Sequence, residues 1–194
     1  AFQPGFSFPF QLTSSDPPKP VPFRIIDGGE LMLPSGRIVA CDPFVSYDRP
    51  AFVQQVGKGR ARVRFSFPMV HGEQGGRVAF ARVEFSPAKV ARWEMALIPG
   101  QTLSTLKADE IFGYPVDAGT GCFADAEAFA ALRQAVAGKP ELTEAWISEG
   151  EEAAKPLGMP FYLNQRMGPA NIIMFGSGWG DGFYASYFGF DAAG

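Results

Sequence analysis

Alternation of charged and apolar residues is the clearest pattern in this chain, and it occurs in three runs between residues 60 and 98. Arginines at positions 60, 62 and 64 alternate with apolar residues at 61, 63 and 65, which is the period of a half-buried strand. The runs 77–85 and 90–98 alternate in the same way, and short loops with Gly or Pro connect all three. We therefore predict an antiparallel meander, whose outer face would carry Arg62, Arg64, Arg82, Glu84, Arg92 and Glu94. Cross-strand ion pairs explain such a face, and anion binding is the alternative.

Further strands are predicted on both sides of this meander. Residues 24–41 have the pattern of a hairpin, with turns at 28–29 and 34–36. Residues 171–175 are apolar enough for a buried strand, and residues 183–190 for an aromatic one. The glycine-rich segment 176–182 between these two would be a hairpin connection, with Asp181-Gly182 as its turn.

Two helices are predicted in the second half of the chain. Residues 124–137 place their apolar side chains on one side of a helix, with Asp125 near its start and Gly138 after its end. An acidic helix over 141–154 would bury Leu142, Ala145 and Trp146. Gly150 is an unfavourable residue inside that second helix.

The composition agrees with a β-rich fold. The 194 residues include 23 Gly and 17 Pro, which favour turns, and 19 Phe, which supply a core. We predict a mainly β (β-rich α+β) fold, an antiparallel sandwich or strongly curved sheet with one or two packed helices. Residues 24–194 would form this domain. The Pro- and Phe-rich residues 1–23 would be an N-terminal arm, which anchors to the domain or inserts into a neighbouring subunit of a homodimer.

Charge and hydropathy exclude two classes of partner. The net charge of −3 argues against nucleic-acid binding, and no apolar run reaches the ~18 residues of a membrane span. Residues 1–100 are net basic and residues 101–194 net acidic, so the two surfaces pair within the fold or the acidic one meets a cationic partner. We expect a cytoplasmic protein, with export as the alternative.

The first segment with candidate chemistry is the glycine-rich stretch 117–125, just before the first predicted helix. Glycines at 119 and 121 permit a close backbone approach, and a helix N-terminus would favour the Cys122 thiolate or a bound anion. A nucleophilic Cys needs a base, however, and nothing in the sequence brings His71, the only histidine, to it. A tight turn with a packed thiol is the simpler interpretation. Cys122 and Cys41 would then be buried free thiols, with a disulfide between them as the alternative.

The second candidate segment is the run of alternating glycines at 176–182. It lacks the Gly-Lys-Ser/Thr ending of a phosphate-binding P-loop and the βαβ setting of a dinucleotide site. Trp179 would therefore be a lid on the core or an exposed platform for a ligand. Asp117, Asp125 and Asp181 are candidate ligands of a divalent cation, although turn-forming aspartates explain them too. No motif identifies a cofactor.

Four segments carry a resemblance to a known family: 33–44, 77–83, 113–125 and 175–182. They are similar to the mainly bacterial family called domain of unknown function 4241, over roughly residues 30–194. The resemblance implies a shared fold and brings no activity. It also suggests that the two glycine-rich segments belong to one feature, side by side.

These observations favour a non-enzymatic binding or interaction protein. It would use the surface around the segments 117–125 and 176–182, with Thr120, Trp179 and Asp181 as ligand contacts. The first alternative is a hydrolase-like enzyme with a site made of Cys122, Asp117 and Asp181, with or without a divalent metal. The second is one component of a bacterial toxin–immunity or secretion pair, which the acidic C-terminal half would suit.

Overall fold

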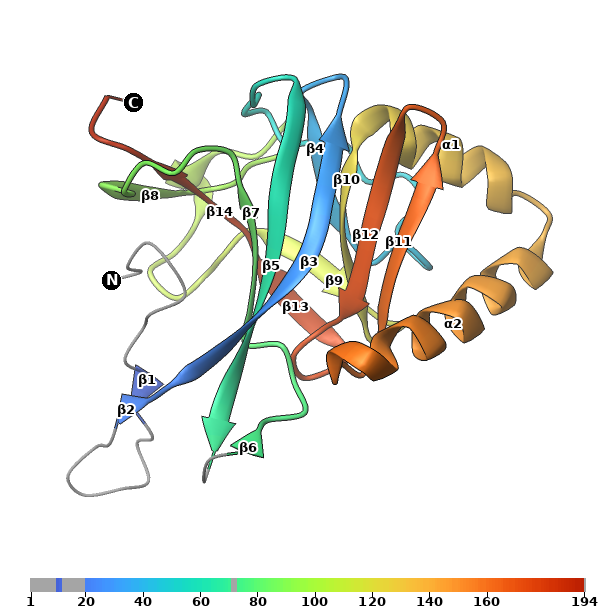
Figure 1. Ribbon diagram of the computed structural model, residues 1–194. Coiled ribbons are helices and arrows are strands. Elements are labelled where there is room, and N and C mark those ends of the chain that lie inside the picture. Colours follow the sequence, from blue (N-terminus) through green and yellow to red (C-terminus); the bar gives the residue numbers. More distant parts are fainter. Residues whose placement is uncertain (1–9, 12–19, 71–72, 194) are drawn as a thin grey trace.

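Two antiparallel sheets and a pair of helices form three layers in the computed structural model, which describes residues 10–11, 20–70 and 73–193 (Figure 1). The middle layer is a sheet with the strand order β11-β12-β10-β4. Helices α1 (Ala126–Val136) and α2 (Pro140–Ala154) cover one of its faces, and the sheet of β3, β5 and β7 packs on the other. The mainly β fold with two packed helices is therefore confirmed.

The middle sheet is buried on both faces except along its edge strand β11, where Asn164 and Arg166 are exposed. It consists of β4 (Ile38–Cys41), β10 (Thr120–Asp125), β11 (Tyr162–Met167) and β12 (Ala170–Gly176). Ile173 and Phe175 of β12 point into the core shared with the other sheet, and Ile172 and Met174 pack beneath the helices. A strand with two covered faces needs a continuous apolar run instead of alternation, which is why 171–175 could be recognised as buried.

The second sheet shows the alternation that the sequence predicts. It consists of β3 (Phe23–Leu33), β5 (Gly59–Val70) and β7 (Phe80–Glu84), with the short β6 (Glu73–Gln74) beside the end of β5. Val63, Phe65 and Phe67 of β5 are fully buried against the middle sheet, while its arginines lie on the outer face. The pairing of β5 with β7 confirms the first two strands of the predicted meander.

Two predicted strand pairings are wrong. The hairpin over 24–41 does not form, because β3 pairs with β5 and β4 pairs with β10 of the middle sheet. All four residues of β4 are buried. In the middle sheet both faces of this strand are covered, so its apolar side chains are stabilised more there than they would be beside β3. The glycines at 28–29 lie in an irregularity within β3, where the register with β5 shifts between Asp27 and Glu30, and not in a turn.

The third meander strand and the predicted 176–182 hairpin are wrong for a related reason. β8 (Arg92–Met95) pairs with β14 (Tyr187–Phe190), and β9 (Gly113–Val116) pairs with β13 (Gly182–Ala185). In Figure 1 the β9–β13 ribbon passes behind β5, and the β8–β14 ribbon lies to the left of β7. The strands that follow β7 and β12, namely β8 and β13, therefore pair with strands elsewhere in the chain. Hydrophobic periodicity does not reveal such pairings.

The remaining elements are short. β1 (Phe10–Gln11) pairs with β2 (Pro20–Val21), and single turns of 3-10 helix lie at Leu103–Thr105 and Lys155–Leu157. The predicted N-terminal arm lies mostly outside the described residues, and its last residue, Phe23, already belongs to β3. Across the described ranges, no helix has the length and apolar character to cross a membrane.

Candidate functional site

The two glycine-rich segments meet. The backbone N–H of Gly119 donates to Oδ1 of Asp181 at 3.2 Å, and the N–H of Ser177 donates to the carbonyl of Gly119 at 2.9 Å. The turn that connects β9 to β10 is limited to residues 117–119, where Gly119 has a φ of 62°. Residues 120–125 are strand β10, which corrects the expectation of one long turn over 117–125. The expected neighbourhood of the two segments is confirmed.

A buried carboxylate, which the sequence analysis did not single out, holds the 117–119 turn. Asp42 is 0% exposed, and its Oδ2 accepts the N–H groups of Asp117 and Ala118 at 3.0 and 2.7 Å. Its Oδ1 accepts the N–H of Phe44 at 3.0 Å. Three backbone donors thus compensate the burial of one carboxylate. The only sequence signal was its place directly after the buried strand β4, within the segment 33–44.

The structure separates Cys122 and Asp125 from the other residues proposed for catalysis and metal binding. Cys122 is fully buried in β10 directly opposite Cys41 of β4, with the two Sγ atoms 3.8 Å apart, and both thiols are free. Burial, together with the hydrogen bond to Cys122, raises the pKa of Cys41 well above its usual value. These thiols pack beneath the helices and have no access to a substrate.

The candidate aspartates have different surroundings. Asp125 is buried at the opposite end of β10 from Thr120, where it caps α1 through the N–H of Glu127 and accepts two hydrogen bonds from Ser35. Asp117 and Asp181 are exposed beside the meeting turns, and Thr120 is buried with its hydroxyl on the Ala118 carbonyl. In the part of the chain that the structure describes, no three His, Cys, Asp or Glu side chains gather in a group that could hold a metal ion. His71 lies outside that part.

Trp179 is presented to solvent by a turn with a fixed backbone. Its side chain is 83% exposed, while its N–H donates to the Tyr184 hydroxyl at 3.0 Å. That hydroxyl and the Ser177 hydroxyl both donate to the carbonyl of Gly180, at 2.9 and 2.8 Å. Of the two roles predicted for Trp179, the lid on the core is wrong, because the residue is exposed and does not belong to the core.

An arginine stacks on this exposed indole. The guanidinium carbon of Arg77 lies 5.1 Å from the centroid of the Trp179 ring, and Nη1 of Arg77 donates to the carbonyl of Gly178 at 2.9 Å. A β-carbon on Gly178 would lie 2.7 Å from the carbonyl oxygen of Val78, so only glycine lets this turn pack against the start of β7. The stack and the close approach together fix the aromatic side chain next to β7.

A groove of about 1130 Å³ begins at this turn. One wall is formed by residues 78–90, which include β7, and the other by residues 184–189 of β13 and β14. Ser177 and Gly178 line the groove as well, and aromatic core residues form its apolar base: Phe52, Tyr114, Phe123 and Phe175. The volume exceeds the ~300–1,000 Å³ of ordinary small-molecule pockets.

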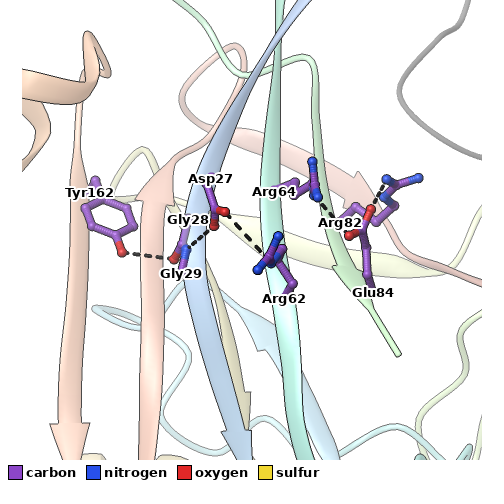
Figure 2. Close-up of polar contacts among 8 residues, drawn as sticks. All are labelled: Asp27, Gly28, Gly29, Arg62, Arg64, Arg82, Glu84 and Tyr162. Atoms are coloured by element: carbon purple, nitrogen blue, oxygen red, sulfur yellow. Dashed lines mark hydrogen bonds and ion pairs between the residues drawn. The ribbon is translucent and has the colours of Figure 1, made fainter. Parts of the chain in front are cut away.

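The outer face of β7 and its neighbours carries a row of charges, shown in Figure 2. Arg64 Nε contacts Glu84 Oε2 at 3.0 Å, and Arg82 pairs with the other oxygen of the same carboxylate. Arg62 Nε lies 3.8 Å from Asp27 on β3. Partial burial lowers the pKa of the Arg82 guanidinium, although Glu84 opposes this shift, and the group stays charged at neutral pH.

This row corrects the predicted outer face in one respect. Arg62, Arg64, Arg82 and Glu84 lie together, whereas Arg92 and Glu94 pair with each other on β8. Asp27 enters the row because of the irregularity in β3, where its Oδ1 accepts the N–H of Gly29 at 2.9 Å and the carbonyl of Gly28 accepts the Tyr162 hydroxyl. The basic residues that line the groove are Arg62, Arg64, Arg82 and Lys89, and the acidic ones are Glu84 and Asp191.

Comparison with known proteins identifies a family and leaves the activity open. The family model described as "Protein of unknown function (DUF4241)" matches residues 31–194 of the chain. Neither the curated proteins nor the solved structures gave a match.

Proposed function

The chain belongs to the DUF4241 family of proteins of unknown function, and we propose that it binds another polypeptide, without catalysing a reaction, through the groove beside β7 and the Trp179 turn. The observation that carries the proposal is the exposure of a large aromatic side chain on a backbone that four hydrogen bonds of the turn hold in place. Trp and Arg are enriched among the residues that dominate the affinity of protein interfaces, and here they are stacked on each other.

Pre-organisation adds to this argument. A side chain that is already fixed loses little entropy on binding, so more of its buried area contributes to affinity. Phe183, Phe85 and Tyr187 are 54%, 44% and 36% exposed near the same turn or along the groove, which extends the aromatic surface. The enzyme alternative has no comparable support, because Cys122 is inaccessible and Asp125 is spent on capping α1.

Selection from a displayed library of random peptides, followed by affinity measurements with purified protein, tests the proposal. We expect Trp179→Ala to weaken selected peptides by about 30-fold or more, since central interface residues contribute ~2 kcal/mol or more. The matched control is Ile147→Ala, which removes an exposed apolar side chain (38%) from α2 in the layer of helices. Equal loss in both variants, or no loss in Trp179→Ala, would contradict a binding surface at this turn.

A further inference from the structure

The wall of the groove formed by β7 is a strand with an open edge. Among the described residues, β7 pairs with β5 alone, over Arg62↔Glu84 to Ser66↔Phe80. Its other side faces the groove, whose lining runs continuously from Val78 to Val90. An unpaired edge presents backbone donors and acceptors that can template another strand.

The pairing pattern shows which backbone groups lie on that edge. The carbonyl of Ser66 accepts the N–H of Ala79 on the β7 side, while the N–H of Met69 donates to Pro22 on the β3 side. Even-numbered residues of β5 therefore turn their backbone groups towards β7, and the register gives these groups to residues 80, 82 and 84. The N–H and C=O groups of Ala81 and Val83 point to the groove.

The two faces of β7 differ in chemistry. The side chains of Ala81 and Val83 pack against the apolar core at the groove's base. Arg82 and Glu84 lie on the opposite face, where Arg64 and Arg82 both pair with the carboxylate of Glu84, so these three side chains together carry one positive charge. A strand added beside β7 would place alternate side chains on these two faces.

We propose that the groove takes an extended peptide with alternating apolar and acidic residues, which adds to the open edge of β7 as a strand. This inference rests on the proposed binding function and specifies the partner's chemistry. Apolar side chains opposite Ala81 and Val83 would cover the aromatic base, and an acidic side chain opposite Arg82 would meet the two arginines. Main-chain hydrogen bonds then supply affinity and the alternating side chains supply specificity, as in other cases of strand addition.

Synthetic peptides of alternating valine and glutamate test this chemistry, with alternating valine and lysine as the comparison. We expect the glutamate peptide to bind at least about 10-fold more tightly, and Arg82→Gln to remove most of that preference. The matched control is Arg133→Gln, an exposed arginine on α1 beyond the middle sheet. Equal binding of the two peptides, or the same loss of preference in both variants, overturns the predicted charge.

Hydrogen exchange tests the mode of binding at single residues. Peptide binding should slow amide exchange at Ala81 and Val83 at least about 10-fold, with smaller changes at Arg82 and Glu84, whose N–H groups already face β5. N-methylation of one alternate set of peptide residues should abolish binding, and N-methylation of the other set should spare it. Sensitivity to both sets, or to neither, overturns strand addition.

The outcomes for the two proposals are separable. Peptides from the library that depend on Trp179 but protect neither Ala81 nor Val83 leave the binding function intact and overturn strand addition. If no selected peptide depends on Trp179 for binding, both the binding function and strand addition are overturned. Protection of Ala81 and Val83 without peptide overturns the proposed partner: it identifies a second copy of this chain if protection rises with protein concentration, and the chain itself if it does not.

Discussion

Asp42 offers the sharpest test of how the site is built, because one side chain supports three backbone donors. Replacing it with alanine leaves the N–H groups of Phe44, Asp117 and Ala118 without their acceptor in a place where Asp42 is 0% exposed. A buried donor that loses its partner costs about 1–3 kcal/mol. Two of the three hydrogen bonds are only part-buried, so each loss is taken at the low end of this range, which gives a total of about 3 kcal/mol.

The expected loss for Asp42→Ala is readily measured. For a domain of this size, about 3 kcal/mol corresponds to a Tm decrease of about 6–12 °C. Urea unfolding followed by tryptophan fluorescence would give the free energy directly. Asp42→Asn should fall between wild type and Asp42→Ala, because its amide keeps an acceptor oxygen but turns an N–H₂ group towards a donor.

The control is Asp109→Asn, which changes an exposed aspartate and should stay within about 0.5 kcal/mol of wild type. A result below about 1 kcal/mol for Asp42→Ala would refute the assignment of Asp42 as the acceptor that holds the turn. The effect should also reach the binding surface. Asp42 holds the 117–119 turn. Asp181, which lies in the same 176–182 segment as Trp179, accepts a hydrogen bond from Gly119 of that turn.

Three further predictions concern stability and thiol chemistry. Gly150→Ala should destabilise by about 1–3 kcal/mol in urea unfolding, despite the better helix propensity of alanine, because the added β-carbon would clash with the Phe161 ring. An effect no larger than that of exposed Glu149→Ala would contradict this prediction. Asn171→Ala should lower the free energy of unfolding by about 2–4 kcal/mol. The Asn171 side-chain amide accepts a hydrogen bond from the N–H of Met32 and donates to Glu30 and Asn164. A loss of stability equal to that of Asn164→Ala would show that the hydrogen bonds to β3 contribute nothing. Neither buried thiol should react with Ellman's reagent at pH 8 before the protein unfolds. The raised pKa of Cys41 keeps its thiol protonated, and Cys122 is equally buried. Rapid reaction of both thiols in the folded protein would refute their burial.

Local patterns identified several elements but not their pairing. They did not reveal β9 or β11, and the single strand predicted over 183–190 is the two strands β13 and β14. The alternation around Val63 identified β5, and the helical periodicity after Asp125 identified α1. These signals lie within a few neighbouring residues. The partners of β4 and β8 come from distant parts of the chain, and the sequence carries no local sign of which apolar strand will meet which.

The candidate site could also be predicted only in part. Trp179 and Asp181 were identified because glycine-rich turns mark places where a backbone needs freedom, and such turns often lie at the surface. Asp42 was missed because an aspartate after a strand is usually a solvated turn residue. Its burial becomes apparent only when the 117–119 turn supplies donors from 75 residues away. The open edge of β7 was hidden by the wrong pairing with residues 90–98.

The pairing of β4 with β10 has a consequence for synthesis of the protein. Cys41 and Cys122 are 81 residues apart, so β4 emerges from the ribosome long before its partner strand β10 exists. At ~5–20 residues per second, that interval is roughly 4–16 s. Throughout this interval, an entirely apolar strand that becomes fully buried in the finished fold lacks its partner, and loop closure is the entropic barrier to their pairing. Aggregation of nascent chains should therefore compete with folding in this window, and slowing translation between residues 42 and 120 should lower the soluble yield.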